Sequence, residues 1–130
     1  MDGATPMILG IGTDLLDVAR MARELEKEAA GFRNTVFTPS EIVYCEAKRY
    51  PARHFAARFA AKEALFKALS GSAPRDFWRE VEVARTGSAP PRLLLHGGMK
   101  EAAARLGVKN ILVSLSHTDS LATASVVLQG

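Results

Sequence analysis

The clearest hydrophobic pattern in the chain lies over residues 53–70, where large apolar residues recur with helical spacing. At about 100° per residue, four large apolar side chains fall on one stripe and five alanines on the other side: Phe55, Phe59, Phe66 and Leu69 opposite Ala57, Ala60, Ala61, Ala64 and Ala68. Lys62 falls in the middle of the large stripe. We therefore predict a long helix over 53–70, ended by Gly71 and covered on more than one side.

The N-terminal part of the chain combines a short apolar run with a stretch of helix formers. MILGIGT, residues 7–13, predicts a buried strand whose glycines allow another backbone or a ligand to come close, with Asp14 at its end. The residues that follow predict a helix over 16–30 that stops at Gly31. A further helix is expected at TPSE, residues 38–41, where a Thr cap and a Glu three residues later form a capping box.

The C-terminal half alternates in the manner of a sheet. It predicts two short strands, a helix and an antiparallel hairpin, over residues 80–85, 92–96, 99–107, 111–118 and 121–128. Without internal repeats, the simplest architecture is one α+β domain over residues 1–130, in which helices, including the long one, pack on a small, mostly antiparallel sheet.

Composition and charge narrow the function only moderately. The 130 residues are 48% hydrophobic and 24% charged, with a net charge of +3, which is typical of a folded domain and compatible with an anionic ligand or an acidic partner protein. The cations lie beside carboxylates without interleaved aromatic residues, which argues against nucleic acid. Cys45 is the only cysteine, and the chain has neither a signal-peptide pattern nor a membrane span, so we expect a cytoplasmic protein.

Five charged positions carry the candidate chemistry. A lysine inside an apolar stripe is costly unless it extends to water or meets an anion, and the sequence leaves both open for Lys62. Glu63 and Lys67 have the spacing of an ordinary helix-surface ion pair. Asp14 is compatible with a helix cap, but if it converges with Glu63 the two form an oxygen site suited to Mg²⁺ and substrate phosphates, with Arg58 among the surrounding cations.

Histidines and glycine motifs add little by themselves. His117 lies at the expected hairpin tip, where a turn role is the more common one, and His54 and His96 have no companion at metal-ligand spacing. The chain contains neither a GxxxxGK[ST] phosphate loop nor a GxGxxG fingerprint.

Three segments taken together identify a family. GIGTDLLDVAR at 10–20, FAARFAAKEALFKAL at 55–69 and VSLSHT at 113–118 resemble the holo-acyl-carrier-protein synthase family of 4′-phosphopantetheinyl transferases in order and spacing. The resemblance implies transfer of 4′-phosphopantetheine from coenzyme A to a serine of apo acyl carrier protein. It also implies dependence on Mg²⁺, with Mn²⁺ as an alternative ion.

The resemblance also implies roles for individual residues. Asp14 and Glu63 would hold the metal and, with Lys67, form the catalytic group. The residues implied to contact coenzyme A are Arg53, Arg58, Lys62, Lys67, His117 and Thr118, and those implied to contact the carrier protein are Arg20, Arg23 and Lys27. The family further implies a homotrimer with active sites between subunits. From hydropathy and charge pattern we expect neither a membrane nor a nucleic acid as partner. The alternative is a subunit that binds coenzyme A or another anionic ligand without turnover.

Overall fold

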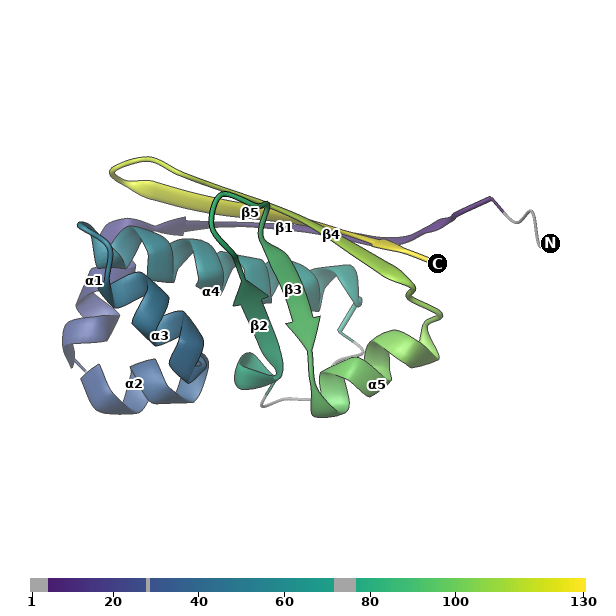
Figure 1. Ribbon diagram of the computed structural model, residues 1–130, viewed down its shortest axis with the longest axis horizontal. Coiled ribbons are helices and arrows are strands. Elements are labelled where there is room, and N and C mark those ends of the chain that lie inside the picture. The colour runs from purple at the N-terminus through teal and green to yellow at the C-terminus, as the bar shows by residue number, and fades with distance from the viewer. Residues whose placement is uncertain (1–4, 28, 72–76) are drawn as a thin grey trace.

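A three-stranded antiparallel sheet and a long helix lying along one of its faces form the centre of the molecule (Figure 1). The computed structural model describes residues 5–27, 29–71 and 77–130. The sheet has the order β1-β5-β4, with β1 Ile8–Asp17, β4 Asn110–His117 and β5 Leu121–Gln129. The long helix is α4, Pro51–Ala68. The predicted α+β class, with a mostly antiparallel sheet and one long helix, is confirmed.

The remaining elements surround this centre. Three helices gather at one end, a two-stranded sheet crosses α4, and a fifth helix closes the other end (Figure 1): α1 Val18–Lys27, α2 Ala29–Val36, α3 Pro39–Glu46, β2 Val81–Ala84, β3 Arg92–Leu95 and α5 Gly97–Arg105. A 3₁₀ turn, Trp78–Glu80, leads into β2. In the parts of the chain that the structure describes, every helix is too short or too polar to be a membrane-spanning segment.

Close contact between β1 and α4 depends on glycine facing alanine. A Cβ on Gly12 would overlap the backbone carbonyl of Ala64, and a Cβ on Gly10 would overlap that of Ala68. The predicted alanine side of the helix is therefore the side that packs against β1, and the buried Ala60, Ala64 and Ala68 belong to the core beneath the sheet. This contact brings the middle of β1 next to the C-terminal half of α4.

The strand β1 is longer than predicted, and the first helix is shorter. Asp14 lies within β1, opposite Ala124 of β5, and not at the end of the strand. The alternation continues to Leu15 and Leu16, which face solvent and core respectively, so pairing with β5 takes precedence over local helix propensity. The helix predicted over 16–30 is replaced by the end of β1, then α1, then α2, and Gly31 lies inside α2 instead of ending a helix.

Other local predictions are confirmed. Thr38 caps α3, accepting a hydrogen bond from the Glu41 amide while the Glu41 side chain accepts one from the Thr38 amide. The long helix begins at Pro51, two residues before the predicted start, because proline is suited to the first helical turn. The C-terminal hairpin of β4 and β5 is present.

The face of the sheet opposite α4 is partly apolar. Ile11, Val127 and Leu112 form a row across the three strands, because the register pairs Ile11 with Val127 and Val127 with Leu112. Ile11 is 70% exposed and Leu15, two positions further along β1, is 64% exposed. Ile11 and Leu15, the exposed apolar residues of β1, therefore lie on the strand that also carries Asp14.

Candidate active site

Asp14 and Lys67 form an ion pair between the sheet and the long helix. Lys67 Nζ donates to Asp14 Oδ1 and to the carbonyl of Thr13, each at 3.0 Å. The Lys67 side chain is 54% exposed, whereas that of Asp14 is 17% exposed. The lysine therefore reaches from the surface of α4 to β1, and holds a carboxylate that the strand places beside the helix.

Glu63 lies one helical turn before Lys67, close to Asp14. Partial burial raises the pKa of Glu63, the negative charge of Asp14 raises it further, and Lys67 and Arg20 act in the opposite direction. Because the net shift is upward, burial and the second carboxylate outweigh the two cations. The structure thus brings together Asp14, Glu63 and Lys67, the three residues predicted from the sequence to form the catalytic group.

The donor set at this place fits a hard divalent cation. Burial and, after it, the negative charge of Asp14 raise the pKa of Glu63, and a cation between the two carboxylates would offset both effects. Within the described residues no group of three or more His, Cys, Asp or Glu is arranged to hold a metal ion. A site with two protein carboxylates suits Mg²⁺, which retains water and substrate phosphate in its other positions.

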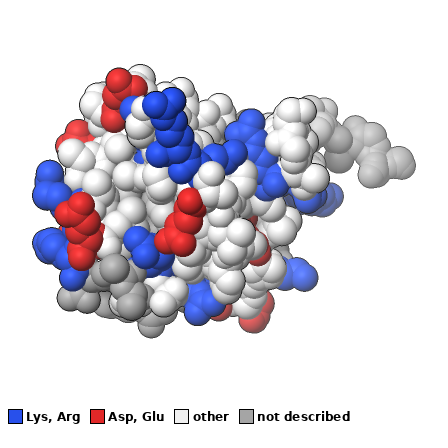
Figure 2. All heavy atoms as spheres, turned by 60° about the vertical axis from the view of Figure 1, so that its left-hand side comes forward, with Lys and Arg blue, Asp and Glu red and all other residues white. Residues whose placement is uncertain are grey.

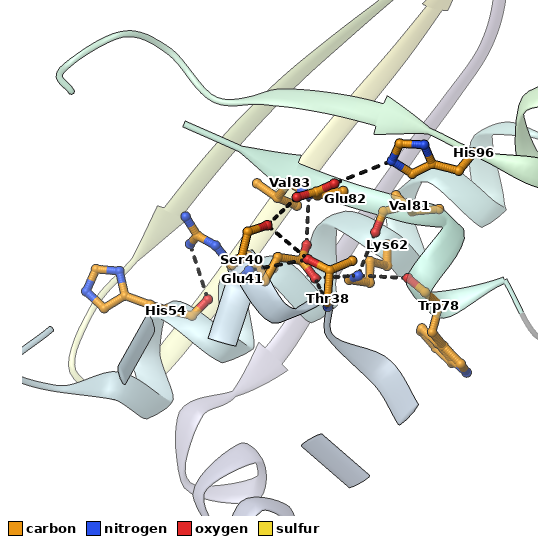
Figure 3. Close-up of polar contacts among 11 residues, drawn as sticks. Thr38, Ser40, Glu41, His54, Lys62, Trp78, Val81, Glu82, Val83 and His96 are labelled. Atoms are coloured by element: carbon orange, nitrogen blue, oxygen red, sulfur yellow. Dashed lines mark hydrogen bonds and ion pairs between the residues drawn. The ribbon is translucent and has the colours of Figure 1, made fainter. Parts of the chain in front are cut away.

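Lys62 lies elsewhere, and its placement corrects the expectation that it contacts phosphate. Its side chain is fully buried, and Nζ donates to Glu41 Oε1 at 2.8 Å and to the carbonyls of Trp78 and Val81 at 2.7 and 2.6 Å. Figure 3 shows these partners converging on the ammonium group from α3, the 3₁₀ turn and β2. All three ammonium hydrogens thus have protein acceptors, so Lys62 meets an anion, but that anion is Glu41.

A second polar cluster surrounds Arg58. This side chain is only 3% exposed, and its guanidinium carbon lies 4.1 Å from the centroid of the Tyr44 ring. NH1 donates to the carbonyl of His54 at 3.4 Å, and the buried Nε has no partner among the described residues. A cavity of about 210 Å³ adjoins it, lined in part by Ser40, Tyr44 and Arg85. A buried guanidinium with spare donors beside a cavity is suited to an anion.

The start of α4 and the β4–β5 turn extend this cluster. Arg53 pairs with Asp119 of the turn at 3.1 Å and lies 4.0 Å from the Tyr50 ring centroid. The ring of His117 lies 5.0 Å from that of His54. Thr118 Oγ1 accepts from the backbone amide of Leu121 and thereby shapes the turn. The structure therefore gathers Arg53, Arg58, His117 and Thr118 around one end of α4.

The two clusters lie on different sides of the same helix. Arg58 and Glu63 are five residues apart on α4, which turns their side chains about 140° from each other. The carboxylate cluster of Asp14, Glu63 and Lys67 faces β1, whereas Arg58 faces α3. One chain thus carries a cluster with two carboxylates on one side of α4 and a buried guanidinium on another.

The predicted carrier-binding cations lie on α1. Arg20, Arg23 and Lys27 are exposed, and Lys27 pairs with Glu24 at 3.4 Å. On the end of the molecule that carries α1 to α3, cationic and acidic side chains are interspersed (Figure 2). Arg20 is the member of this set whose charge acts on Glu63, so it links the surface of α1 to the carboxylate cluster.

Two residues of the Arg58 cluster received no functional role from the sequence. Tyr44 lies against the Arg58 guanidinium, and His54 lies between Tyr44 and His117, with ring centroids 6.1 and 5.0 Å away. The signal for His54 was its spacing, because a residue four positions before Arg58 lies on the same side of the helix. Nothing local in the sequence connects Tyr44 to α4, because that contact is tertiary.

Comparisons with known proteins identify the class of protein to which this fold and this carboxylate pair belong. The sequence model of the 4′-phosphopantetheinyl transferase superfamily matches residues 10–125, so the chain belongs to that superfamily. The resemblance found in the three sequence motifs is thus confirmed.

Relatives of known name give the particular type within this class. The chain is 44% identical over 124 residues to a holo-[acyl-carrier-protein] synthase of Solibacter usitatus, covering 95% of this chain and 99% of that protein. It is 45% identical over 127 residues to one of Anaeromyxobacter sp. (strain K), covering 95% and 98%.

Solved structures agree with the sequence relatives. The holo-[acyl-carrier-protein] synthase of Neisseria meningitidis superposes with a TM-score of 0.85 at 28% identity, covering 95% of this chain and all of that chain. The Helicobacter pylori enzyme in complex with coenzyme A superposes with a TM-score of 0.77 at 28% identity, covering 91% and 98%.

Proposed function

We propose that this chain transfers the 4′-phosphopantetheine arm of coenzyme A to a serine hydroxyl of an apo acyl carrier protein. The observation that carries the proposal is the convergence of Asp14, Glu63 and Lys67 in a chain of the 4′-phosphopantetheinyl transferase superfamily. In the reaction the serine oxygen forms a bond to the phosphorus next to pantetheine. The pyrophosphate bond of coenzyme A breaks, and adenosine 3′,5′-bisphosphate leaves.

The chain's own groups supply a base and a cation at the reacting phosphate. Glu63 accepts the serine proton, directly or through a water. Lys67, half exposed and already bound to Asp14, donates to the non-bridging oxygens as negative charge builds up on them. Asp14 positions Lys67 through their 3.0 Å contact.

The two carboxylates would also hold the metal. Asp14 and Glu63 would be the residues that hold Mg²⁺, or Mn²⁺ in its place, because Mg²⁺ is commonly bound by one or two protein carboxylates. The bound ion supplies a Lewis acid that offsets negative charge on the pyrophosphate. Support comes from the chemistry of the donor set, two carboxylates of which Glu63 has its pKa raised by burial and by the negative charge of Asp14.

The Arg58 cluster would bind the nucleotide end of coenzyme A. Arg58 has unused donors beside a cavity, and Arg53, His117 and Thr118 surround the same end of α4. A phosphomonoester there would pair with the buried guanidinium, which among the described residues has no carboxylate partner. Lys62 takes no part, because its ammonium is committed to Glu41.

The functional unit would be a homotrimer. One chain directs the carboxylates and Arg58 to different sides of α4. A single coenzyme A would therefore contact the carboxylates of one subunit and the Arg58 cluster of the next. The apolar row of Ile11, Val127 and Leu112 gives neighbouring copies a surface to bury. Exposed cations on α1, Arg20, Arg23 and Lys27, would bind an acidic carrier protein next to the carboxylates.

Intact-mass spectrometry of a carrier protein tests the proposal. The purified chain is incubated with coenzyme A, Mg²⁺ and an apo acyl carrier protein, with a carrier whose acceptor serine is replaced by alanine as the control. We expect a mass gain of one phosphopantetheine on the first carrier only. Binding of coenzyme A without any mass gain would instead identify a non-catalytic coenzyme A binding subunit.

A further inference from the structure

His54 lies in the middle of the Arg58 cluster, although neither its spacing to other histidines nor the sequence motifs give it a role. Its ring lies 5.0 Å from that of His117 on β4 and 6.1 Å from that of Tyr44 on α3. Its backbone carbonyl accepts from Arg58 NH1. Figure 3 shows the His54 imidazole pointing away from Lys62 and its hydrogen-bond partners. His54 lies near the N-terminal end of α4.

The groups that face His54 are almost all cationic or neutral. They come from α4, from the turn after α3 and from β4: Arg53, Arg58, Lys48, His117 and the phenol of Tyr44. Arg85 adds a further charge near Tyr44. The carboxylate at this end, Asp119, is 90% exposed and pairs with Arg53. Among the described residues, His54 is thus a titratable group in a positive field whose nearby carboxylate, Asp119, is exposed.

The charge state of His54 follows from this setting. Burial lowers its pKa, and the charges of His117, Arg58, Lys48 and Arg53 lower it further, to about 4. In the free protein His54 is therefore neutral at physiological pH. A phosphate dianion placed in the cluster would reverse the sign of the local field and favour the imidazolium.

We propose that His54 is a phosphate-binding residue that takes up a proton from solution when the 3′-phosphate of coenzyme A binds beside Arg58 and His117. This inference rests on the proposed function and deepens it by adding a residue and a proton to the substrate site. The imidazolium donates a charge-assisted hydrogen bond to the phosphate, and the uptake of one positive charge offsets part of the charge of the dianion.

The size of the effect follows from linkage. If phosphate binding returns the pKa of His54 to the ordinary value of about 6.5, roughly 0.7 proton is taken up per site at pH 6. The contribution of His54 then makes binding at pH 6 about fourfold tighter than at pH 8.

Titration calorimetry in buffers of different ionisation enthalpy measures the proton uptake directly. Coenzyme A is titrated into wild type, His54→Phe and the control His96→Gln, with 3′-dephospho-coenzyme A as the matched ligand. Phenylalanine keeps an aromatic ring between Tyr44 and His117, and His96 directly follows β3, with its ring 3.4 Å from Glu82. His54→Gln serves as a second non-titrating variant if His54→Phe does not fold.

We expect wild type and His96→Gln to take up about 0.7 proton per site more than the His54 variants when coenzyme A binds at pH 6, and no more than those variants when the dephospho ligand binds. Equal proton uptake by wild type and both His54 variants on binding coenzyme A would overturn the proposal, as would the same excess of wild type over the variants with the dephospho ligand. Failure of wild type to bind coenzyme A at all would overturn the proposed function as well, so the two failures are distinguishable.

Discussion

Lys62 and Glu41 form a fully buried ion pair, with 2.8 Å between Nζ and Oε1 and neither side chain exposed to solvent. Glu41 also accepts from the amides of Thr38 and Val83, and Lys62 also donates to two carbonyls. The pair therefore joins α3, α4 and β2 through charged groups whose hydrogen bonds are made inside the protein. Residue 62 lies next to Glu63, so the network also fixes the part of α4 that carries the carboxylate site.

Replacing Lys62 by methionine should destabilise the protein strongly. The change leaves the Glu41 carboxylate buried without its cation, which costs about 3–5 kcal/mol in comparable pairs. Chemical denaturation of Lys62→Met measures this loss. The double variant Glu41→Met, Lys62→Met should recover part of the stability, because no buried charge remains. A loss below about 1 kcal/mol for Lys62→Met would contradict the buried pair.

Replacing Gly12 by alanine should separate β1 from α4. The new Cβ would overlap the Ala64 carbonyl, and we expect a loss of about 3 kcal/mol. The remaining folded protein should be less active, because Asp14 lies two residues further along β1. Gly87→Ala is the control, since Gly87 has a φ of 57° and open space around it; it should cost about 1 kcal/mol and leave the activity unchanged.

Glu63→Gln should stabilise the protein at neutral pH while it removes activity. The pKa of Glu63 is raised in the folded state by burial and by Asp14, so the folded protein binds more protons than the unfolded chain, and the charged carboxylate costs stability above this pKa. After discounting for partial exposure, the gain should be about 0.5 kcal/mol at pH 7.

The pH dependence of this gain is its check. Below the unfolded pKa of about 4.5 both the wild-type carboxyl and the glutamine are neutral, so the two unfolding free energies should converge as the pH falls. Denaturation curves at pH 7 and at pH 3.5 compare the two proteins. A gain that is the same at both pH values would mean that charge at Glu63 is not its cause.

Lys67→Gln should affect turnover much more than stability. Its side chain is 54% exposed, so the ion pair with Asp14 contributes at most about 1 kcal/mol to folding. In the proposed reaction the ammonium group meets charge that develops on phosphate, and its loss should lower kcat about a hundredfold. Lys109→Gln, a change at another exposed lysine, which directly precedes β4, should change neither quantity. A kcat of Lys67→Gln within twofold of wild type would show that Lys67 is not a catalytic residue.

Secondary structure could be predicted best from the sequence where the local pattern and the tertiary packing favour the same element. The capping box at Thr38 and the alternation of β4 and β5 are local, and both are present. Asp14 was placed at a strand end because residues 16–30 favour a helix, whereas pairing with β5 extends β1 to Asp17. That pairing is a long-range contact that no local window contains.

For the site residues on α4, the sequence predicts on which side of the helix each one lies, but not which residues of other elements it contacts. Periodicity placed Lys62 within an apolar stripe and implied either water or an anion. The anion, Glu41, lies 21 residues earlier on α3, and no local pattern indicates that contact. His54 and Arg58 share one side of the helix by spacing, but the cluster depends on Tyr44 and His117, which the fold brings in from α3 and β4.

The most direct test of the central claim is the rate at which an apo acyl carrier protein gains mass from coenzyme A and Mg²⁺. Wild type and Glu63→Gln are compared at equal concentration, after circular dichroism has established that both are folded. Our account predicts a gain of one phosphopantetheine per carrier with wild type and a rate at least a hundredfold lower with Glu63→Gln, a loss of about the size expected for a catalytic base. A normal rate with Glu63→Gln, or no gain with wild type, would contradict it.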